Sequence, residues 1–243
     1  MTNNLRILLQ TDPFTDDINE KSFYHYPALK QRHSLLLRLF AGGSRLVFII
    51  GDPGSGKTLF LNQFLANDEQ NWKKCRVHPD ATVGKRGNVP EYPAFINNNS
   101  EMPSILMDDA HKLSAAELIF FIRMLGGDGQ PRRLRQILFF GESSILQLIM
   151  QLENEIPNDA TMEKIYMPSL SQKETNEYIS RRLCATGYTG SMPFAQPDIN
   201  RIFQHSGGNP GNINSYASIA LGKKLHGKNK VTSLIKTMLK NSD

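Results

Sequence analysis

Apolar residues along this chain fall into short unbroken runs, separated by longer stretches in which they recur every three or four positions. An unbroken run of four or five apolar residues is typical of a strand buried on both faces, and the second spacing is typical of an amphipathic helix. Strands that alternate with helices favour a parallel sheet covered on both sides. We predict five strands, at residues 46–50, 75–78, 104–107, 137–140 and 164–167.

The predicted helices begin at recognisable signals. Ser114 with Glu117, and Ser171 with Glu174, each form the S-x-x-E pattern of a capping box. After residue 168 the strand pattern stops and only helical spacing remains. The helices that we predict cover residues 27–40, 59–65, 114–125, 145–152, 172–183, 199–203, 210–221 and 231–239. We therefore expect an α/β domain over residues 1–168 and a small helical domain over residues 169–243.

Two further expectations concern packing. Residues 5–26 lack a regular pattern, and their aromatic residues Phe14 and Phe23 either cover the base of a ligand or pack into the core. The helix that begins at Pro210 is expected to bury one apolar face. That face would consist of Ile213, Tyr216, Ala217, Ala220 and Leu221.

Composition narrows the class of protein only slightly. The chain has 243 residues, 40% apolar and 21% charged, which suits a globular α/β core with a small second lobe. Its net charge of +5 is compatible with DNA, an acidic partner, a membrane surface or solubility alone. Cys75 and Cys184 match no metal spacing, and we interpret them as reduced thiols. Since the sequence has neither a membrane-length apolar run nor a signal peptide, we expect a cytoplasmic location, although an anchor could follow Asp243 in a parent chain.

The strongest chemical signal is the segment at residues 51–58, which reads GDPGSGKT and fits the phosphate-binding P-loop G-x-x-x-x-G-K-[ST]. It follows a predicted strand and precedes a predicted helix, as the motif requires. Its glycines let backbone N–H groups surround phosphate oxygens, while Lys57 would reach the β- and γ-phosphates and Thr58 would hold Mg²⁺. The predicted nucleotide-binding residues of this segment are Gly51, Asp52, Pro53, Gly54, Ser55, Gly56, Lys57, Thr58 and Leu59.

A second signal is the strand at residues 104–107, which ends in two acids about fifty residues after the P-loop. This is the form of a Walker B strand. Asp108 would hold Mg²⁺ through water, and Asp109 would orient the attacking water. His111 lies just beyond, and it has two interpretations, a packing or capping residue and a catalytic one.

The strand at residues 137–140 ends in polar residues. In a parallel sheet the carboxyl ends of the strands face the ligand crevice. Glu142 or Ser143 could therefore sense a γ-phosphate; the alternative is that Ser143 or Ser144 only caps the next helix.

The order of these motifs resembles that of the AAA+ ATPases, and within them the ExeA/GspA type, whose relatives include ATPase portions of DamX-like cell-division proteins. The resemblance covers nearly the whole chain. The matching residues are Asp12-Pro13-Phe14, the P-loop at 51–58, Met107-Asp108-Asp109-Ala110-His111 at the family's D-E-A-H, Phe140-Gly141-Glu142, Glu174 with Tyr178-Ile179 and Arg182-Leu183, and Ser206-Gly207-Gly208-Asn209-Pro210 with Ile213-Asn214.

The resemblance implies a P-loop NTPase fold with a C-terminal helical lid, ATP and Mg²⁺ as cofactors, and a homo-oligomer with nucleotide at the subunit interfaces. It assigns Lys57 and Asp109 catalytic roles and places Glu142 and Pro210 at the nucleotide. It also implies a partner in a secretion, cell-envelope or cell-division machine, with peripheral association at the cytoplasmic face of the inner membrane through a parent chain.

Three departures from the family pattern bear on hydrolysis. The family's catalytic Glu is replaced by Asp109, and a carboxylate about 1 Å short of its water can cost roughly 10²-fold in rate. The arginine of the family's G-x-P-R is replaced by Gly211, and Glu142 stands where a neutral amide is common. ATP binding tolerates these changes better than rapid hydrolysis does.

Three functions follow as hypotheses: a slow Mg²⁺-dependent ATPase that drives or gates assembly, a nucleotide-gated switch with negligible hydrolysis, and a DNA-binding regulator of the transposition type. An ATPase of this class needs an arginine supplied by a neighbouring subunit. The candidates are Arg132, Arg133, Arg135, Arg181 and Arg182, for most of which a solvated basic face is the alternative role.

Overall fold

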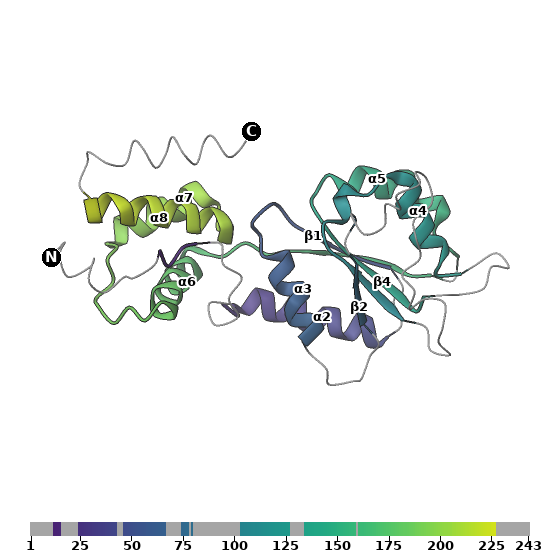
Figure 1. Ribbon diagram of the computed structural model, residues 1–243, viewed down its shortest axis with the longest axis horizontal. Coiled ribbons are helices and arrows are strands. Elements are labelled where there is room, and N and C mark those ends of the chain that lie inside the picture. The colour runs from purple at the N-terminus through teal and green to yellow at the C-terminus, as the bar shows by residue number, and fades with distance from the viewer. Residues whose placement is uncertain are drawn as a thin grey trace. The chain divides into compact units, whose positions relative to one another are not determined.

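The computed structural model describes residues 12–15, 24–42, 46–66, 74–77, 79, 103–126, 134–158 and 160–226 (Figure 1). These residues form two compact units. Pro27–Pro168 make up the first, and residues from Ser169 onward, together with residues 12–15 and 24–26, make up the second.

The first unit is built on a parallel sheet of five strands, as predicted. The strands are β1 (Leu46–Ile50), β2 (Lys74–Val77), β3 (Ser104–Met107), β4 (Gln136–Gly141) and β5 (Met162–Tyr166), in the order β2-β3-β4-β1-β5. Strands β3, β4 and β1 are the three central strands, and they are buried along their whole length. They are also the most apolar of the five. Edge strand β5 begins at Met162, two residues before the predicted start. Met162 pairs with Leu46 of β1 and Glu163 pairs with Val47, so β5 includes these two residues ahead of the predicted start.

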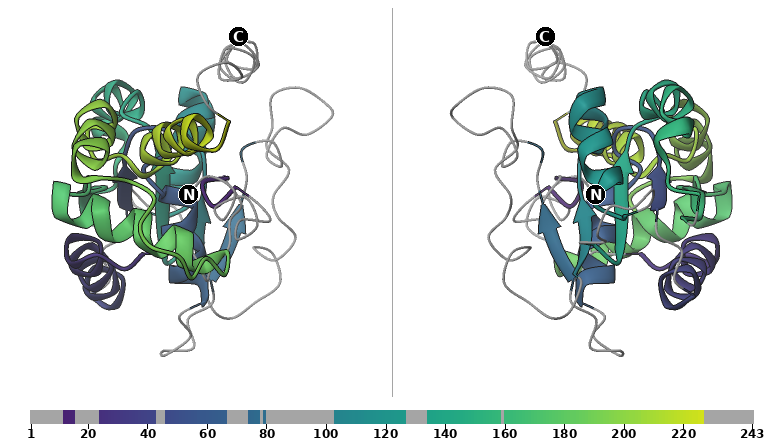
Figure 2. Two further views of the ribbon diagram at one scale, coloured as in Figure 1. Left: turned by 90° about the vertical axis from the view of Figure 1, so that its left-hand side faces the viewer. Right: turned by 90° about the vertical axis from the view of Figure 1, so that its right-hand side faces the viewer.

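Helices cover both faces of this sheet. They are α2 (Pro27–Ala41), α3 (Lys57–Ala66), α4 (Ala115–Arg123) and α5 (Ile145–Gln151), with short 3₁₀ turns η4 (Ala110–Lys112) and η5 (Glu153–Glu155). Helices α2 and α3 lie on one face and α4 and α5 on the other (Figures 1 and 2).

The two faces are filled by alternate residues of the same strands, since successive side chains of a strand point to opposite sides. On one side Phe48 of β1 belongs to a core cluster with Phe121 of α4 and Ile149 of α5. On the other side the Phe140 ring of β4 lies 6.4 Å from the Phe60 ring of α3. Burial on both faces is why these strands appear in the sequence as unbroken apolar runs.

Both predicted capping boxes are present. The Ser114 hydroxyl accepts from the Glu117 N–H at the start of α4, and Glu117 in turn accepts from the Ser114 N–H. Ser171 and Glu174 repeat this arrangement at the start of α6. Each box satisfies two N–H groups that a helix start leaves without intrahelical partners.

The second unit contains α6 (Gln172–Ala185), α7 (Gln196–Ser206) and α8 (Pro210–His226). In α8, Ile213, Ala217 and Leu221 are buried at the predicted four-residue spacing. The expectation for Tyr216 is wrong, because its side chain is 39% exposed and its ring lies 5.5 Å from that of His205 on α7. Tyr216 is three positions after Ile213, which places it at the margin of the buried face.

Residues 12–15 pack within this helical unit, whereas the sequence analysis grouped them with the α/β domain. The Phe14 ring is buried 6.1 Å from the Phe194 ring, so its packing role is the correct alternative. Arg182 of α6 is also buried and donates to the carbonyl oxygens of Pro13, at 2.8 Å, and Thr15. Arg182 therefore has a structural role in its own chain, and we remove it from the candidates for an arginine acting on a neighbouring subunit.

Some predictions lie outside the described residues, among them the helix at 231–239, Phe23, and the candidate residues Arg132 and Arg133. Within the described part of the chain, no helix combines the length and the apolar character needed to cross a bilayer.

Candidate functional site

The predicted site residues of the α/β unit meet at one edge of the sheet. The P-loop follows β1, Asp108 and Asp109 follow β3, and Glu142 follows β4. These three strands are neighbours and parallel, so their carboxyl ends share an edge. The carboxylates of Glu142, Asp108 and Asp109 lie close enough to Lys57 that each of them favours its charged form and raises its pKa.

The P-loop has the backbone conformation that its glycines permit. Gly54 and Gly56 have φ of +74° and +89°, values that favour glycine strongly. Gly51 is constrained by space, since a Cβ there would lie 2.5 Å from the Ser55 Oγ and 2.8 Å from the Met167 Cβ. The loop is closed by the Ser55 N–H, which donates to the Asp52 carbonyl at 3.1 Å. The loop then continues directly into α3, whose helix dipole adds attraction for an anion.

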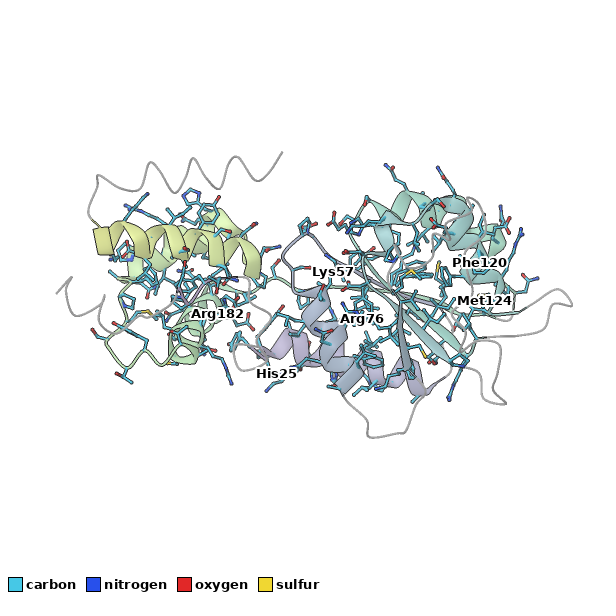
Figure 3. The ribbon with its side chains drawn as sticks, in the orientation of Figure 1. His25, Lys57, Arg76, Phe120, Met124 and Arg182 are labelled. Atoms are coloured by element: carbon cyan, nitrogen blue, oxygen red, sulfur yellow. The ribbon has the colours of Figure 1, made fainter. Side chains whose placement is uncertain are left out.

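Lys57 folds over this loop at the start of α3 (Figure 3). Its side chain is buried, and its Nζ donates to the carbonyl oxygens of Gly51 at 2.8 Å and Asp52 at 3.0 Å. Burial lowers the pKa of Lys57 from its ordinary value, and the nearby carboxylates, Glu142 first, oppose that shift. The P-loop carbonyl oxygens therefore hold the Lys57 ammonium by hydrogen bonds, and the negative charges of the nearby carboxylates stabilise it.

The loop also contains a buried donor without a partner. The Ser55 Oγ is buried and makes no hydrogen bond to the described residues. An unsatisfied buried hydroxyl is costly, so such a group points to an acceptor from outside the chain. With the glycine backbone and Lys57 around it, this segment fits a polyphosphate.

Asp108 is the most buried acid of the site, at 3% exposed. Its Oδ1 accepts the Asp109 N–H at 3.1 Å, and its Oδ2 forms an ion pair with the Arg76 guanidinium at 2.9 Å. A second nitrogen of Arg76 donates to Asn62 of α3 at 2.9 Å. No motif in the sequence points to Arg76 or Asn62, because only the pairing of β2 beside β3 brings Arg76 to Asp108.

Asp109 has an unusual backbone and a cationic partner. It is the one non-glycine residue with positive φ in the described part of the chain, with φ +52° and ψ +32°. This left-handed region is one that aspartate tolerates better than most residues. Its Oδ2 lies 2.7 Å from Nζ of Lys112, and this hydrogen bond lowers the pKa of Asp109 against the opposing effect of partial burial.

Glu142 has one contact that bears on the alternatives for His111. The His111 Nε2 lies 3.5 Å from the Glu142 Oε1, and the His111 Nδ1 is buried without a hydrogen-bond partner in the described residues. His111 therefore links the turn after β3 to the end of β4. Ser144 stands at the N-cap position of α5, although its side chain makes no capping hydrogen bond. The Ser143 hydroxyl instead donates to Asp52 of the P-loop at 3.4 Å.

The structure also describes the other residues that we predict to bind the nucleotide or the metal. Their binding roles stay predictions. Thr58 and Leu59 are half-buried on the first turn of α3, Pro53 is exposed at the tip of the P-loop, and Pro210 begins α8 in the helical unit. The described residues contain no group of three or more metal-ligating side chains. Mg²⁺ sites of nucleotide enzymes use one or two protein ligands with phosphate and water, so Thr58 and Asp108 fit that chemistry.

A scan against protein-family models and a search of curated proteins each found no match. Solved structures do match over most of the chain. The Aeropyrum pernix ORC2 protein in its ADPNP-ADP complexes is 14% identical, with a TM-score of 0.51, over 88% of this chain and 65% of that one. This chain thus spans about two thirds of the ORC2 chain.

Two further structures extend the comparison. The Thermotoga maritima RuvB Holliday junction branch migration motor is 17% identical, with a TM-score of 0.56, over 93% of this chain and 72% of that one. Domain III of the T. maritima replication initiation protein DnaA is 16% identical, with a TM-score of 0.56, over 92% and 97%. At such identities the likeness shows the fold alone. The chain has the fold of the AAA+ ATPases.

Proposed function

We propose that this chain binds ATP with Mg²⁺ at residues 51–58 and hydrolyses the ATP slowly. The observation that carries the proposal is the closed P-loop, with Lys57 buried over it and the Ser55 hydroxyl left without a partner. Both groups are donors that a triphosphate would engage. The AAA+ fold supports the same proposal, and the ADPNP-ADP complexes of ORC2 are an example of that fold with adenine nucleotides.

Four residues of this edge have roles in the proposal. Lys57 holds the β- and γ-phosphates, and Thr58 and Asp108 hold the metal. Asp109 accepts a proton from the attacking water and orients it towards the γ-phosphate. Mg²⁺ supplies positive charge to the phosphate oxygens when it is bound.

Several features support slow turnover. Asp109 is shorter than the glutamate usual at this position, and it is already paired with Lys112. Gly211 occurs where an arginine is usual in similar ATPases, and Glu142 adds negative charge next to Lys57. The two features of Asp109 weaken activation of the attacking water. Gly211 and Glu142 weaken the stabilisation of charge on the γ-phosphate during transfer.

We place this ATPase in a homo-oligomer, with nucleotide between subunits and residues 169–243 as its C-terminal helical lid domain. The resemblance to the ExeA/GspA type supports a partner in a secretion, cell-envelope or cell-division machine. It also supports a location in the cytoplasm or at the cytoplasmic face of the inner membrane, reached through a parent chain. Arg132, Arg133, Arg135 and Arg181 remain candidates for the arginine supplied by a neighbouring subunit.

Two other functions have support of their own. The Lys112–Asp109 ion pair favours a nucleotide-gated switch with negligible hydrolysis, because it engages the acid that would activate water. The branch migration motor RuvB and the replication initiator DnaA share the fold, which supports a DNA-binding regulator, together with the net charge of +5. A gel shift that weakens steeply with salt would favour the DNA function.

The test measures ATP affinity, phosphate release and mass on the same samples, for the wild type, Lys57→Ala and Asp109→Asn. We expect ATP binding that Lys57→Ala abolishes, slow single-turnover hydrolysis that Asp109→Asn reduces further, and larger particles in mass photometry with ATP and Mg²⁺. Binding without hydrolysis above the Lys57→Ala background would leave the switch as the function. Equal ATP affinity in the wild type and Lys57→Ala would refute a nucleotide function at this loop.

A further inference from the structure

Arg76 joins the strand that carries the metal-binding acid to the helix that follows the P-loop. It lies on edge strand β2, beside β3, where Arg76 pairs in register with Leu106. One nitrogen of its guanidinium is 2.9 Å from the Asp108 Oδ2, and another is 2.9 Å from the Asn62 Oδ1. Figure 3 shows Arg76 on β2 and Lys57 at the start of α3.

This contact occupies the Asp108 oxygen that does not accept the Asp109 N–H. Asp108 is buried, its Oδ1 already accepts the Asp109 N–H, and its Oδ2 is held by Arg76. A buried carboxylate needs a compensating charge, and Arg76 provides one. Mg²⁺ prefers the same carboxylate oxygens, so the guanidinium and the dication are alternative partners for one anion.

The second contact places the guanidinium on the side of α3 that bears the other metal ligand. Asn62 is four residues after Thr58, and residues four apart share one face of a helix. Arg76 therefore lies along the face that leads to Thr58, and its side chain is 30% exposed.

We propose that Arg76 competes with the divalent cation for Asp108, so that it sets the Mg²⁺ concentration at which this site fills. With Arg76 on Asp108 the acid is neutralised and the metal is disfavoured. When the metal arrives with ATP, Arg76 releases the Oδ2 and remains on Asn62. The proposal rests on the proposed function for its consequence in ATP binding, but the competition at Asp108 can be measured without nucleotide.

The first test uses Mn²⁺ alone as the probe and measures free Mn²⁺ by electron paramagnetic resonance. The proteins are the wild type, Arg76→Gln, Arg76→Lys, and Arg76→Gln combined with Asp108→Asn. Arg123→Gln is the control for loss of a surface arginine, because Arg123 forms an ion pair of the same 2.9 Å length, but more exposed, with Glu155, between α4 and η5. Thermal unfolding checks that each variant is folded.

We expect Arg76→Gln to bind Mn²⁺ about two- to fivefold more tightly than the wild type, as for the removal of one partly exposed competing charge. Adding Asp108→Asn should abolish that gain. Arg76→Lys, which keeps a cation, should resemble the wild type, as should Arg123→Gln. No gain in Arg76→Gln, including no measurable binding by either protein, would overturn the proposal.

The second test measures ATP affinity with excess EDTA and across a Mg²⁺ titration. Arg76→Gln should lower the Mg²⁺ concentration for half-maximal effect by a similar factor and leave the affinity in EDTA within about twofold of the wild type. A large loss of affinity in EDTA would instead show that Arg76 contacts phosphate, and would overturn the proposal. If the wild type binds no ATP, the proposed function fails, while the Mn²⁺ result still decides the competition at Asp108.

Discussion

Lys112 forms an ion pair with Asp109 within a single turn of the chain. The Lys112 Nζ lies 2.7 Å from the Asp109 Oδ2; Asp109 is the N-cap of η4, and Lys112, three positions later, is its last residue. The carboxylate that would orient water is therefore engaged by a neighbouring ammonium, and this bond is the main cause of its lowered pKa. Because both side chains are about half exposed, the pair is weak enough to open.

We expect Lys112→Ala to free Asp109 and to raise single-turnover ATP hydrolysis about twofold, since an exposed pair of this spacing is worth about 0.5 kcal/mol. The stability of the protein should change by no more than that amount. Lys173→Ala on α6 is the control, because Lys173 is an exposed lysine of the other unit. A fall in the rate would show that Lys112 assists Asp109 and does not restrain it.

The length of the acid at position 109 gives a second prediction. Asp109→Glu should raise the hydrolysis rate about tenfold or more, because misplacement of a catalytic group by about 1 Å costs up to roughly 10²-fold. ATP affinity should stay unchanged, since the residue acts on water and not on the nucleotide. The measurement is single-turnover phosphate release, with Asp109→Asn as the lower reference. An unchanged rate in Asp109→Glu would show that side-chain length does not limit this enzyme.

Gly207 and Gly208, after α7, form a matched pair for a stability test. Both have positive φ, +59° and +75°. A Cβ on Gly207 meets open space, whereas one on Gly208 would lie 2.1 Å from the Leu170 carbonyl oxygen. We expect Gly207→Ala to cost about 1 kcal/mol of unfolding free energy, from backbone strain alone. Gly208→Ala should cost about 2 kcal/mol more, because its Cβ must also displace backbone. Urea unfolding measures both, and equal losses would contradict the steric argument.

Arg182 gives a second stability prediction. It donates to two carbonyl oxygens of residues 12–15, a geometry that a planar guanidinium can reach and a lysine cannot reproduce. Arg182→Lys should therefore lower the unfolding free energy by about 2 kcal/mol. The adjacent Arg181 is exposed, and Arg181→Lys is the control, with an expected change within about 0.5 kcal/mol. Similar losses in the two variants would show that the contact to residues 12–15 adds nothing specific.

Asp198 gives a pH prediction. It caps α7 through the Ala195 N–H and pairs with Lys224 of α8 at 2.8 Å. The hydrogen bond from Lys224 lowers the pKa of Asp198 below its ordinary value of 3.8. The unfolded chain therefore takes up this proton at a higher pH than the folded chain does, so the stabilisation is complete above about pH 4 and is lost as the pH falls through the folded pKa.

The measurement is the difference in unfolding free energy between the wild type and Asp198→Asn from pH 7 to pH 3. We expect a difference of about 0.5 kcal/mol that is constant down to about pH 5 and shrinks below about pH 4. Glu163→Gln on β5, an exposed acid, is the control. A difference that grows as the pH falls would have the wrong sign for this linkage.

Local sequence rules were sufficient for much of this protein. The P-loop, the unbroken strands and the two capping boxes each depend on residues within a few positions of one another, so their physical causes can be read in the order of the chain. The alternation of strands and helices was also enough to predict the parallel sheet. Consecutive parallel strands need a crossover, usually a helix, that brings the chain back to the end of the sheet where strands begin.

Contacts between distant residues could be known only from the folded chain. Arg76 and Asp108 are 32 positions apart, and they meet because β2 pairs with β3. Arg182 and Pro13 are 169 positions apart, so nothing in the sequence indicated that residues 12–15 pack with the helical unit and not with the α/β domain. Sequence spacing identified the acids and the phosphate loop, because those depend on local geometry. Which cation holds Asp108 was decided by packing, since the order of the strands places Arg76 beside it, whereas Lys112 reaches Asp109 within one turn of the chain.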